Sequence, residues 1–249
     1  MGPAATLHAQ HICNTLTQVP GAAFPTSSFG FGINNTDTSV GVLSGPLASI
    51  SRVAFAFSNG VFKPVSPVLS GFPQSTAVYG INDSNRVVGS TSFTGASFSF
   101  VCTALLTGLI CDDVTVIAFP EAGSTTVPHG INNAGDIVGT YSLNGVSHGF
   151  IDIGGMYQML DAPGATGGTI AWGINNLGQV VGQYTDATGT HGFLATPIRF
   201  AGTPGFSNCH GQSVAALTQQ FGGLNAAAAA LGFPSVQALQ NAIKAFCQG

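Results

Sequence analysis

Short apolar runs, interrupted by Gly, Asn, Ser and Thr, recur along most of the chain. Between positions 114 and 153 these runs predict four strands, at 114–119, 127–131, 137–141 and 148–153. The stretches 132–135 and 144–145 lie between strands and contain Asn and Gly, which tolerate the positive φ of tight turns. The pattern predicts hairpins of short strands.

A motif of five identical positions recurs four times. Each copy reads Gly-Ile-Asn followed by Val-Gly, and the last Gly always lies nine positions after the first, as 41 lies after 32. The copies begin at 32, 80, 130 and 173, so the motif predicts four similar units of 40–50 residues. The structural positions of this repeat are Gly32, Asn34, Gly41, Gly80, Asn82, Gly89, Gly130, Asn132, Gly139, Gly173, Asn175 and Gly182.

The second glycine of each motif falls inside a strand, which we expect to be the third of its unit. Glycine weakens a strand unless something needs the space above it. We therefore expect an aromatic ring of a neighbouring unit, such as Phe31, Tyr79 or Trp172, to approach each of these glycines.

Four units of four strands predict an all-β domain, a four-bladed β-propeller-like ring. An open stack of similar sheets is the alternative, because it also buries the faces between units. From Pro204 the pattern becomes helical, with helices expected at 213–220, 224–231 and 236–247. The expected divisions are a leader at 1–14, the repeat domain at 15–200 and a helical segment at 201–249.

The cysteines indicate disulfides and export. Cys102 with Cys111, and Cys209 with Cys247, bracket a short loop and the C-terminal segment, and Cys13 is left over. No pair has the CxxC spacing of a zinc ribbon or a thioredoxin-type site. Residues 7–9 resemble the end of a signal-peptide cleavage site, so we expect the leader to be its remnant.

The charge excludes some functions. Charged residues are 6% of the chain, and its five basic residues are scattered, so no surface for nucleic acid or a polybasic membrane anchor is expected. No apolar stretch reaches the length of a transmembrane helix. At 45% hydrophobic residues, however, the chain is not of disordered composition.

Candidate sites come from histidines, acids and asparagines. His129, His148 and His191 could bind a ligand or a metal, together with Trp172. Because equivalent positions hold Tyr79, Trp172 or Phe98, we favour packing over metal binding and expect no cofactor.

Asp152 and Asp161 are weak candidates for the carboxylate pair of a glycosidase. No G-x-S-x-G elbow of a serine hydrolase is present. The repeated asparagines could bind a neutral glycan, but we favour their role as turn residues.

The motif Gly-Ile-Asn-Asn-x-Gly-x-Val-Val-Gly followed by His-Gly-Phe resembles the bacterial extracellular repeat of the HAF family, over about residues 15–196. The His-Gly-Phe steps lie at 148–150 and 191–193, with Gly where the family name has Ala. Steps 53–55 and 98–100 lack the His. The resemblance implies export and a repeated β architecture, and it implies no activity.

We therefore expect an exported, non-enzymatic, propeller-like module for adhesion, glycan binding or self-assembly at the cell surface. The alternatives are a secreted hydrolase acting on a neutral polymer and an extracellular metal-binding protein. The expected partners are a neutral glycan or polymer, or further copies of the chain bound through residues 1–20 or the helical tail. Cys13 is placed to link such copies covalently.

Overall fold

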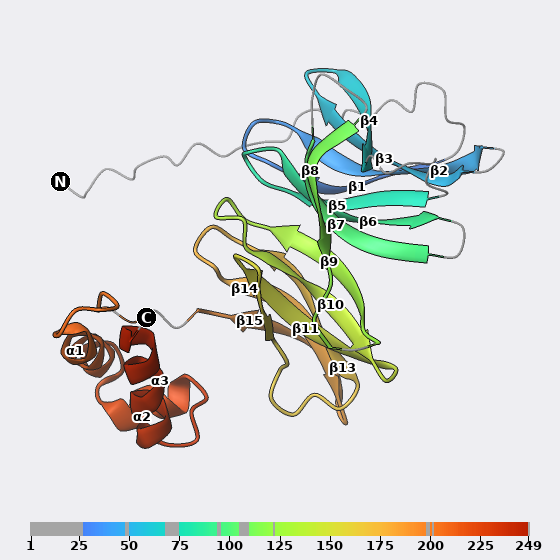
Figure 1. Ribbon diagram of the computed structural model, residues 1–249. Coiled ribbons are helices and arrows are strands. Elements are labelled where there is room, and N and C mark those ends of the chain that lie inside the picture. Colours follow the sequence, from blue (N-terminus) through green and yellow to red (C-terminus); the bar gives the residue numbers. More distant parts are fainter. Residues whose placement is uncertain are drawn as a thin grey trace, which may run out of the picture. The chain divides into compact units, whose positions relative to one another are not determined.

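The computed structural model describes residues 27–47, 50–67, 75–93, 96–104, 110–121, 123–197, 200 and 202–248. The protein is mostly β with a small C-terminal helical part (Figure 1). It divides into two compact units after Ala195, close to the boundary expected near position 200.

Successive strands pair antiparallel as meanders. The first repeat unit consists of β1 (Ser27–Ile33), β2 (Ser39–Leu47), β3 (Ile50–Ser58) and β4 (Val61–Pro67). The second consists of β5 (Ser75–Ile81), β6 (Arg86–Phe93), β7 (Ala96–Ala104) and β8 (Ile110–Ile117). Parallel pairing of β4 with β8 joins both units into one eight-stranded sheet.

The other two units form separate sheets. The third unit consists of β9 (Thr125–Ile131), β10 (Ile137–Leu143), β11 (Val146–Ile153) and β12 (Met156–Met159). The fourth consists of β13 (Gly168–Ile174), β14 (Val180–Asp186) and β15 (Gly189–Ala195). Its described part therefore has one strand fewer than the other units.

The expectation of four sheets of four strands is corrected in two respects. Units one and two share a sheet, and each unit begins at the strand that carries Gly-Ile-Asn, one strand later than predicted. Strand 114–119 accordingly belongs to β8 of the second unit. The described residues do not show a four-bladed propeller, and the strand expected at 15–19 lies outside them.

A β-bulge explains the second glycine of each motif. The first strand bulges at Phe31, Tyr79, His129 and Trp172, and this brings a first-strand carbonyl over the glycine of the second strand. The glycine also pairs across the sheet with a phenylalanine of the third strand. These cross-strand pairs are Gly41–Phe55, Gly89–Phe100, Gly139–Phe150 and Gly182–Phe193.

The expected approach of a neighbouring unit's aromatic residue is therefore wrong. The carbonyl and, at positions 89, 139 and 182, the ring that crowd the glycine come from its own sheet. These glycines also lie in the second strand of their unit, not the third.

The core lies between successive units. One buried cluster holds Val40 of the first unit with Ile81 of the second, and the next holds Val88 of the second with Ile131 of the third. The largest fully buried side chains of the repeat region are Phe55, Phe100 and Phe150. Each unit therefore depends on its neighbour to bury its apolar face.

The C-terminal unit contains α1 (Cys209–Phe221), α2 (Leu224–Ala230) and α3 (Val236–Gln248). They pack around Leu217, Leu239 and Ile243. Glycine at 222 ends α1 in the left-handed conformation, as Gly does at many helix ends. In the part of the chain that the structure describes, no helix is long and apolar enough to cross a membrane.

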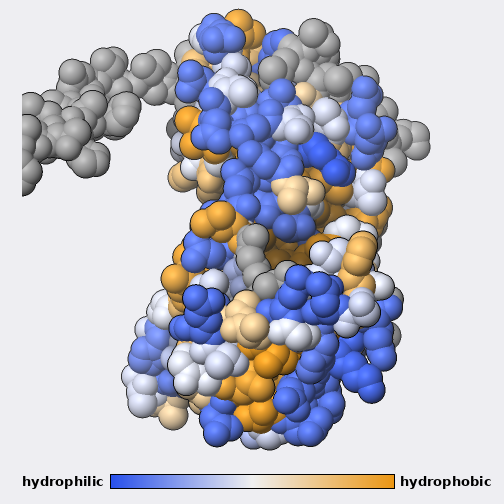
Figure 2. Space-filling view, turned by 90° about the vertical axis from the view of Figure 1, so that its left-hand side faces the viewer, coloured by the Kyte–Doolittle hydropathy of each residue, from blue (hydrophilic) through white to orange (hydrophobic). Residues whose placement is uncertain are grey.

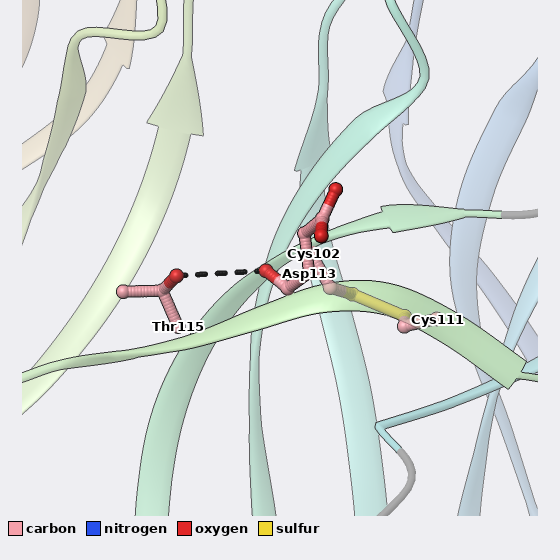
Figure 3. Close-up of a disulfide and its surroundings, with 4 residues drawn as sticks. All are labelled: Cys102, Cys111, Asp113 and Thr115. Atoms are coloured by element: carbon pink, nitrogen blue, oxygen red, sulfur yellow. Dashed lines mark hydrogen bonds between the residues drawn. A yellow bond between two sulfur atoms is a disulfide. The ribbon is translucent and has the colours of Figure 1, made fainter.

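Both expected disulfides are present within the described residues. Cys102–Cys111 joins β7 to β8, with Cα atoms 5.6 Å apart (Figure 3). Cys209–Cys247 joins α1 to α3, with Cα atoms 5.7 Å apart. Disulfides are typical of an oxidising, extracellular environment. Cys13 lies outside the described residues.

The bulge explanation predicts the effect of a methyl group at Gly139. Gly139→Ala should lower the free energy of unfolding by about 1–3 kcal/mol, because the new Cβ meets the Val127 carbonyl and the Phe150 ring. Gly30→Ala is the matched control, since its Cβ would meet no atom within 4 Å, and it should change stability by less than about 0.5 kcal/mol. Urea unfolding at low protein concentration measures both. Equal effects of the two substitutions would contradict the explanation.

Candidate functional site

The asparagine of each motif closes the turn between the first two strands. The Asn132 Oδ1 accepts a hydrogen bond from the backbone N–H of Asp136 at 2.9 Å. Asn34, Asn82 and Asn175 accept equivalent bonds from residues four positions later, and a second bond from residues two positions later. This is the local function of an Asx turn.

The other end of the same side chain reaches the next unit. The Nδ2 atoms of Asn34, Asn82 and Asn132 donate to the backbone carbonyls of Asn82, Asn132 and Asn175, at 3.1, 3.0 and 3.3 Å. In the fourth unit, the Asn175 Nδ2 donates instead to Gln179 of its own turn. We call this row of four residues the asparagine ladder. It connects the units in chain order.

A second row of hydrogen bonds runs beside the asparagine ladder. The backbone N–H groups of Asn35, Asp83 and Asn133 donate to side-chain oxygens of Asp83, Asn133 and Asn176, at 2.8, 2.9 and 2.9 Å. Bonds from Asn35 and Asn133 to the exposed Asp83 carboxylate hold the pKa of Asp83 below its usual value. This carboxylate therefore stays ionised between two amide groups.

Close backbone contact accompanies these ladders. A Cβ built on Gly32 would lie 3.3 Å from the Gly80 Cα, and one on Gly80 would lie 3.2 Å from the Gly130 Cα. The same separation, 3.2 Å, holds from Gly130 to the Gly173 Cα. A side chain at these positions would separate the units, so the first glycine of each motif is an interface residue.

The bulge residues form a row of rings along the first strands. The ring centroids lie 5.7 Å apart for Phe31–Tyr79, 6.0 Å for Tyr79–His129 and 4.6 Å for His129–Trp172. We call this set the aromatic row. Its two end members, Phe31 and Trp172, are each about half exposed.

Polar atoms of the aromatic row bond to the second strand. The Tyr79 hydroxyl contacts Ser90, and the His129 Nε2 contacts the Thr140 hydroxyl at 3.2 Å. The Trp172 Nε1–H donates to Gln183. Burial lowers the pKa of His129 to about 4, so this ring is neutral at pH 7 and takes the place of an aromatic side chain.

Of the predicted ligand-binding residues, the structure brings together His129 and Trp172. The other two histidines each pair with an acid of their own unit. The His148 Nδ1 lies 2.7 Å from Asp161, and its ring stacks on Tyr141. No group of three metal-ligating side chains occurs in the described ranges, so the three histidines do not form the metal site considered as an alternative.

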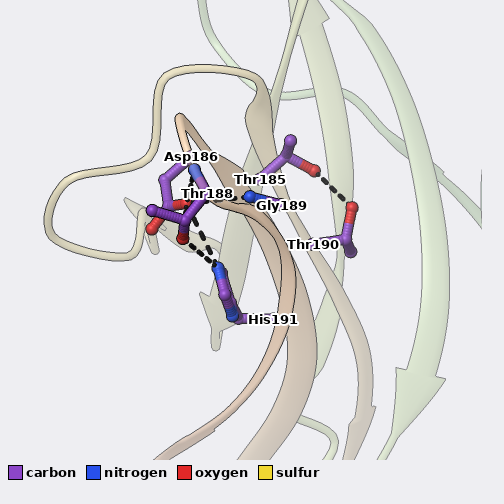
Figure 4. A network of polar contacts seen from close by, with 6 residues as sticks. All are labelled: Thr185, Asp186, Thr188, Gly189, Thr190 and His191. Carbon is purple, nitrogen blue, oxygen red and sulfur yellow. Dashed lines mark hydrogen bonds and ion pairs between the residues drawn. The ribbon is translucent and has the colours of Figure 1, made fainter.

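His191 belongs to the hairpin between β14 and β15 (Figure 4). Its Nε2 lies 3.1 Å from Asp186 and 2.9 Å from the Thr188 hydroxyl. Hydrogen bonds from Thr188 lower the pKa of Asp186 to about 2, and the contact with His191 adds a smaller effect in the same direction. The carboxylate of Asp186 and the hydroxyl of Thr188 thus contact the same ring nitrogen. In a catalytic triad the acid and the hydroxyl contact different nitrogens of the histidine.

The two weak catalytic candidates have separate partners. Asp152 is buried, accepts a bond from the Gly155 N–H and has a raised pKa because of this burial. Asp161 instead bonds to His148 and to the Gly149 N–H. The hydrogen bonds described for the two carboxylates therefore share no partner.

Sequence reasoning missed the end faces of the repeat region. The motif valines Val40, Val88 and Val138 are fully buried, whereas Val181 at the same place in the fourth unit is 51% exposed. On the first strand, Ile81 and Ile131 are buried, whereas Ile33 is 70% exposed. The repeat itself could have indicated these exposed faces, because its first and last copies have only one neighbouring copy each in this chain.

Other apolar side chains of the two end units are exposed as well. Leu194 is exposed on the fourth unit, and Phe29 and Phe31 are exposed on the first. In the space-filling view, hydrophobic residues reach the surface in patches among hydrophilic ones (Figure 2). Apolar surface that is buried inside the repeat is thus uncovered at its ends.

No family model matches the chain, and no curated protein is found to be similar to it. The resemblance to the HAF repeat accordingly stays a prediction from the motif.

Burial of His129 predicts a specific dependence of stability on pH. The folded protein holds His129 neutral down to about pH 4, while the unfolded chain takes up a proton below about pH 6.5. Stability is therefore lost as pH falls from 6.5, and this histidine accounts for about 2–3 kcal/mol of the loss at pH 4. His129→Tyr, which copies Tyr79, should remove that component.

Urea unfolding of both proteins between pH 7 and pH 4 measures the difference, since all other titrating groups are common to them. Parallel stability curves would show that His129 is not desolvated.

Proposed function

We propose that this chain is an exported, non-enzymatic structural module whose copies assemble by repeating its internal interface. The observation that carries the proposal concerns a valine–isoleucine contact that recurs between units. At the two ends of the repeat region one member of this contact is present without the other. Internal interfaces bury the motif valine of one unit in a cluster with the motif isoleucine of the next. Val181 and Ile33 are the two remaining members, and both are exposed.

The two ends are complementary rather than identical. At each internal interface the earlier unit supplies the valine and the asparagine Nδ2, and the later unit supplies the isoleucine and a backbone carbonyl. The fourth unit offers the first set, and the first unit offers the second. Docking of one copy onto another would continue the asparagine ladder and the aromatic row. A head-to-tail interface of this kind builds open chains unless a ring closes.

Low charge favours the same assembly. With 6% charged residues and a net charge of −4, copies of the protein repel one another weakly. The two disulfides and the resemblance to an extracellular repeat support action outside the cell, at its surface. We propose an open stack of units in preference to the four-bladed ring, since the exposed end faces have no place in a closed ring.

Binding of a neutral glycan is a second candidate, favoured by the aromatic row. Aromatic rings present flat apolar surface beside a polar edge, and Phe31 and Trp172 are partly exposed. Both rings also lie at the ends of the row, so a docked copy would cover them. The two candidates therefore compete for the same side chains.

Substitution of one end residue should abolish assembly. In a Cys13→Ser background, which excludes a covalent link through that residue, we expect oligomers at micromolar concentration by sedimentation velocity. Val181→Arg should give monomers, because it places a charge in the apolar contact. Val116→Arg is the matched control: Val116 is 56% exposed on β8 of the second unit, which is not an end unit, and its substitution should leave assembly unchanged.

A mixture tests whether the interface is head-to-tail. Ile33→Arg should also be monomeric alone, but it keeps its fourth-unit face, while Val181→Arg keeps its first-unit face. Mixed, they should form dimers and nothing larger. Parent protein that stays monomeric would contradict the proposal, and if it also bound neutral polysaccharides on a glycan array, the second candidate would replace it.

A further inference from the structure

Among the described residues, the fourth unit has one strand fewer than each of the other units. In units one to three, the third strand pairs on one side with the second strand and on the other with a fourth, as in β11 with β10 and β12. β15 pairs with β14, and among the described residues no strand lies at its other edge. A free edge offers a row of backbone N–H and C=O groups for pairing.

The missing strand has a counterpart in the N-terminal sequence. In the third unit, β12 runs into Pro163-Gly164-Ala165 before β13 begins. Ahead of β1, residues 15–19 (Thr-Leu-Thr-Gln-Val) run into Pro20-Gly21-Ala22. This segment is rich in residues that favour strands. By its place in the repeat it corresponds to the fourth strand of a preceding unit.

Repeat positions give this segment a register on β15. In the third unit, Met156 lies opposite Ile153 and Met159 lies opposite Phe150. Alignment on the Pro-Gly-Ala sequence matches Cys13 to Met156 and Leu16 to Met159.

The third strands of the third and fourth units are aligned in the same way. Thr196 and Phe193 of the fourth unit match Ile153 and Phe150 of the third, through their His-Gly-Phe steps. The alignment thereby matches Cys13 to the position opposite Thr196, which is exposed.

We propose that residues 13–19 of one copy add to β15 of a second copy as the fourth strand of its last unit. The inference rests on the proposed assembly and names the contact that completes it. Inside the chain, a fourth strand leads directly into the unit that docks on the same sheet, as β12 leads into β13. A copy that docks its first unit on the fourth unit of another therefore brings residues 13–19 beside β15. Strand addition of this type binds through backbone hydrogen bonds.

The register predicts a disulfide between copies. Thr196→Cys, in the full chain that keeps Cys13, places a thiol opposite Cys13 at a distance that a disulfide spans. After mild oxidation, non-reducing electrophoresis should show a series of cross-linked multimers, and peptide mapping should join residue 13 to residue 196.

Two controls test the register. Thr190→Cys, on exposed β15 surface, is six residues from the position opposite Cys13 and should give at least about fivefold less product joined to Cys13. Thr196→Cys combined with Cys13→Ser should give none.

Each outcome decides between the two proposals. A link between 13 and 196 within single chains would support the strand pairing but overturn its donation to a second copy. Assembly in solution without this link, or equal linking at 190 and 196, would overturn the inference and leave the proposed function standing. Absence of both the link and assembly would overturn both.

Discussion

Backbone contact between successive glycines is the constraint on which the rest of this structure depends. The first strands approach so closely that a Cβ on Gly32, Gly80 or Gly130 would touch the next unit. At this separation an asparagine side chain that already closes its own turn can also reach the neighbouring carbonyl. The same separation sets the spacing of the aromatic row and buries the motif valines. The first glycine of the motif therefore allows the asparagine hydrogen bond, the ring contact and the valine packing to recur together between units.

A molecule built in this way is stabilised mainly by contacts between neighbours, so its ends differ from its middle. Stacked repeats usually end in units with a polar outer face. Here Val181 and Ile33 keep the apolar residue of the repeat and are exposed. The same contacts that hold the units together thus leave two complementary surfaces, and this is the physical basis of the assembly we propose.

Much of the fold could be predicted from the sequence, because a repeat at fixed spacing and paired cysteines are local signals. Four units, short strands and two disulfides follow from them. The number of sheets could not be predicted, since the pairing of β4 with β8 involves no motif residue. Nor could the bulge at His129, which depends on how two strands pair. The asparagines looked like turn residues alone, because the sequence does not show that the free Nδ2 of one turn meets the next turn.

Amide hydrogen exchange at two protein concentrations tests the central claim most directly, because it reports on each strand in the unmodified protein. If copies associate through the end units, exchange of Ser27–Ile33 and of Gly189–Ala195 should become slower as concentration rises from nanomolar to micromolar. Exchange of Arg86–Phe93 and of Ile137–Leu143, inside the stack, should not change. End strands whose exchange is independent of concentration would contradict the account.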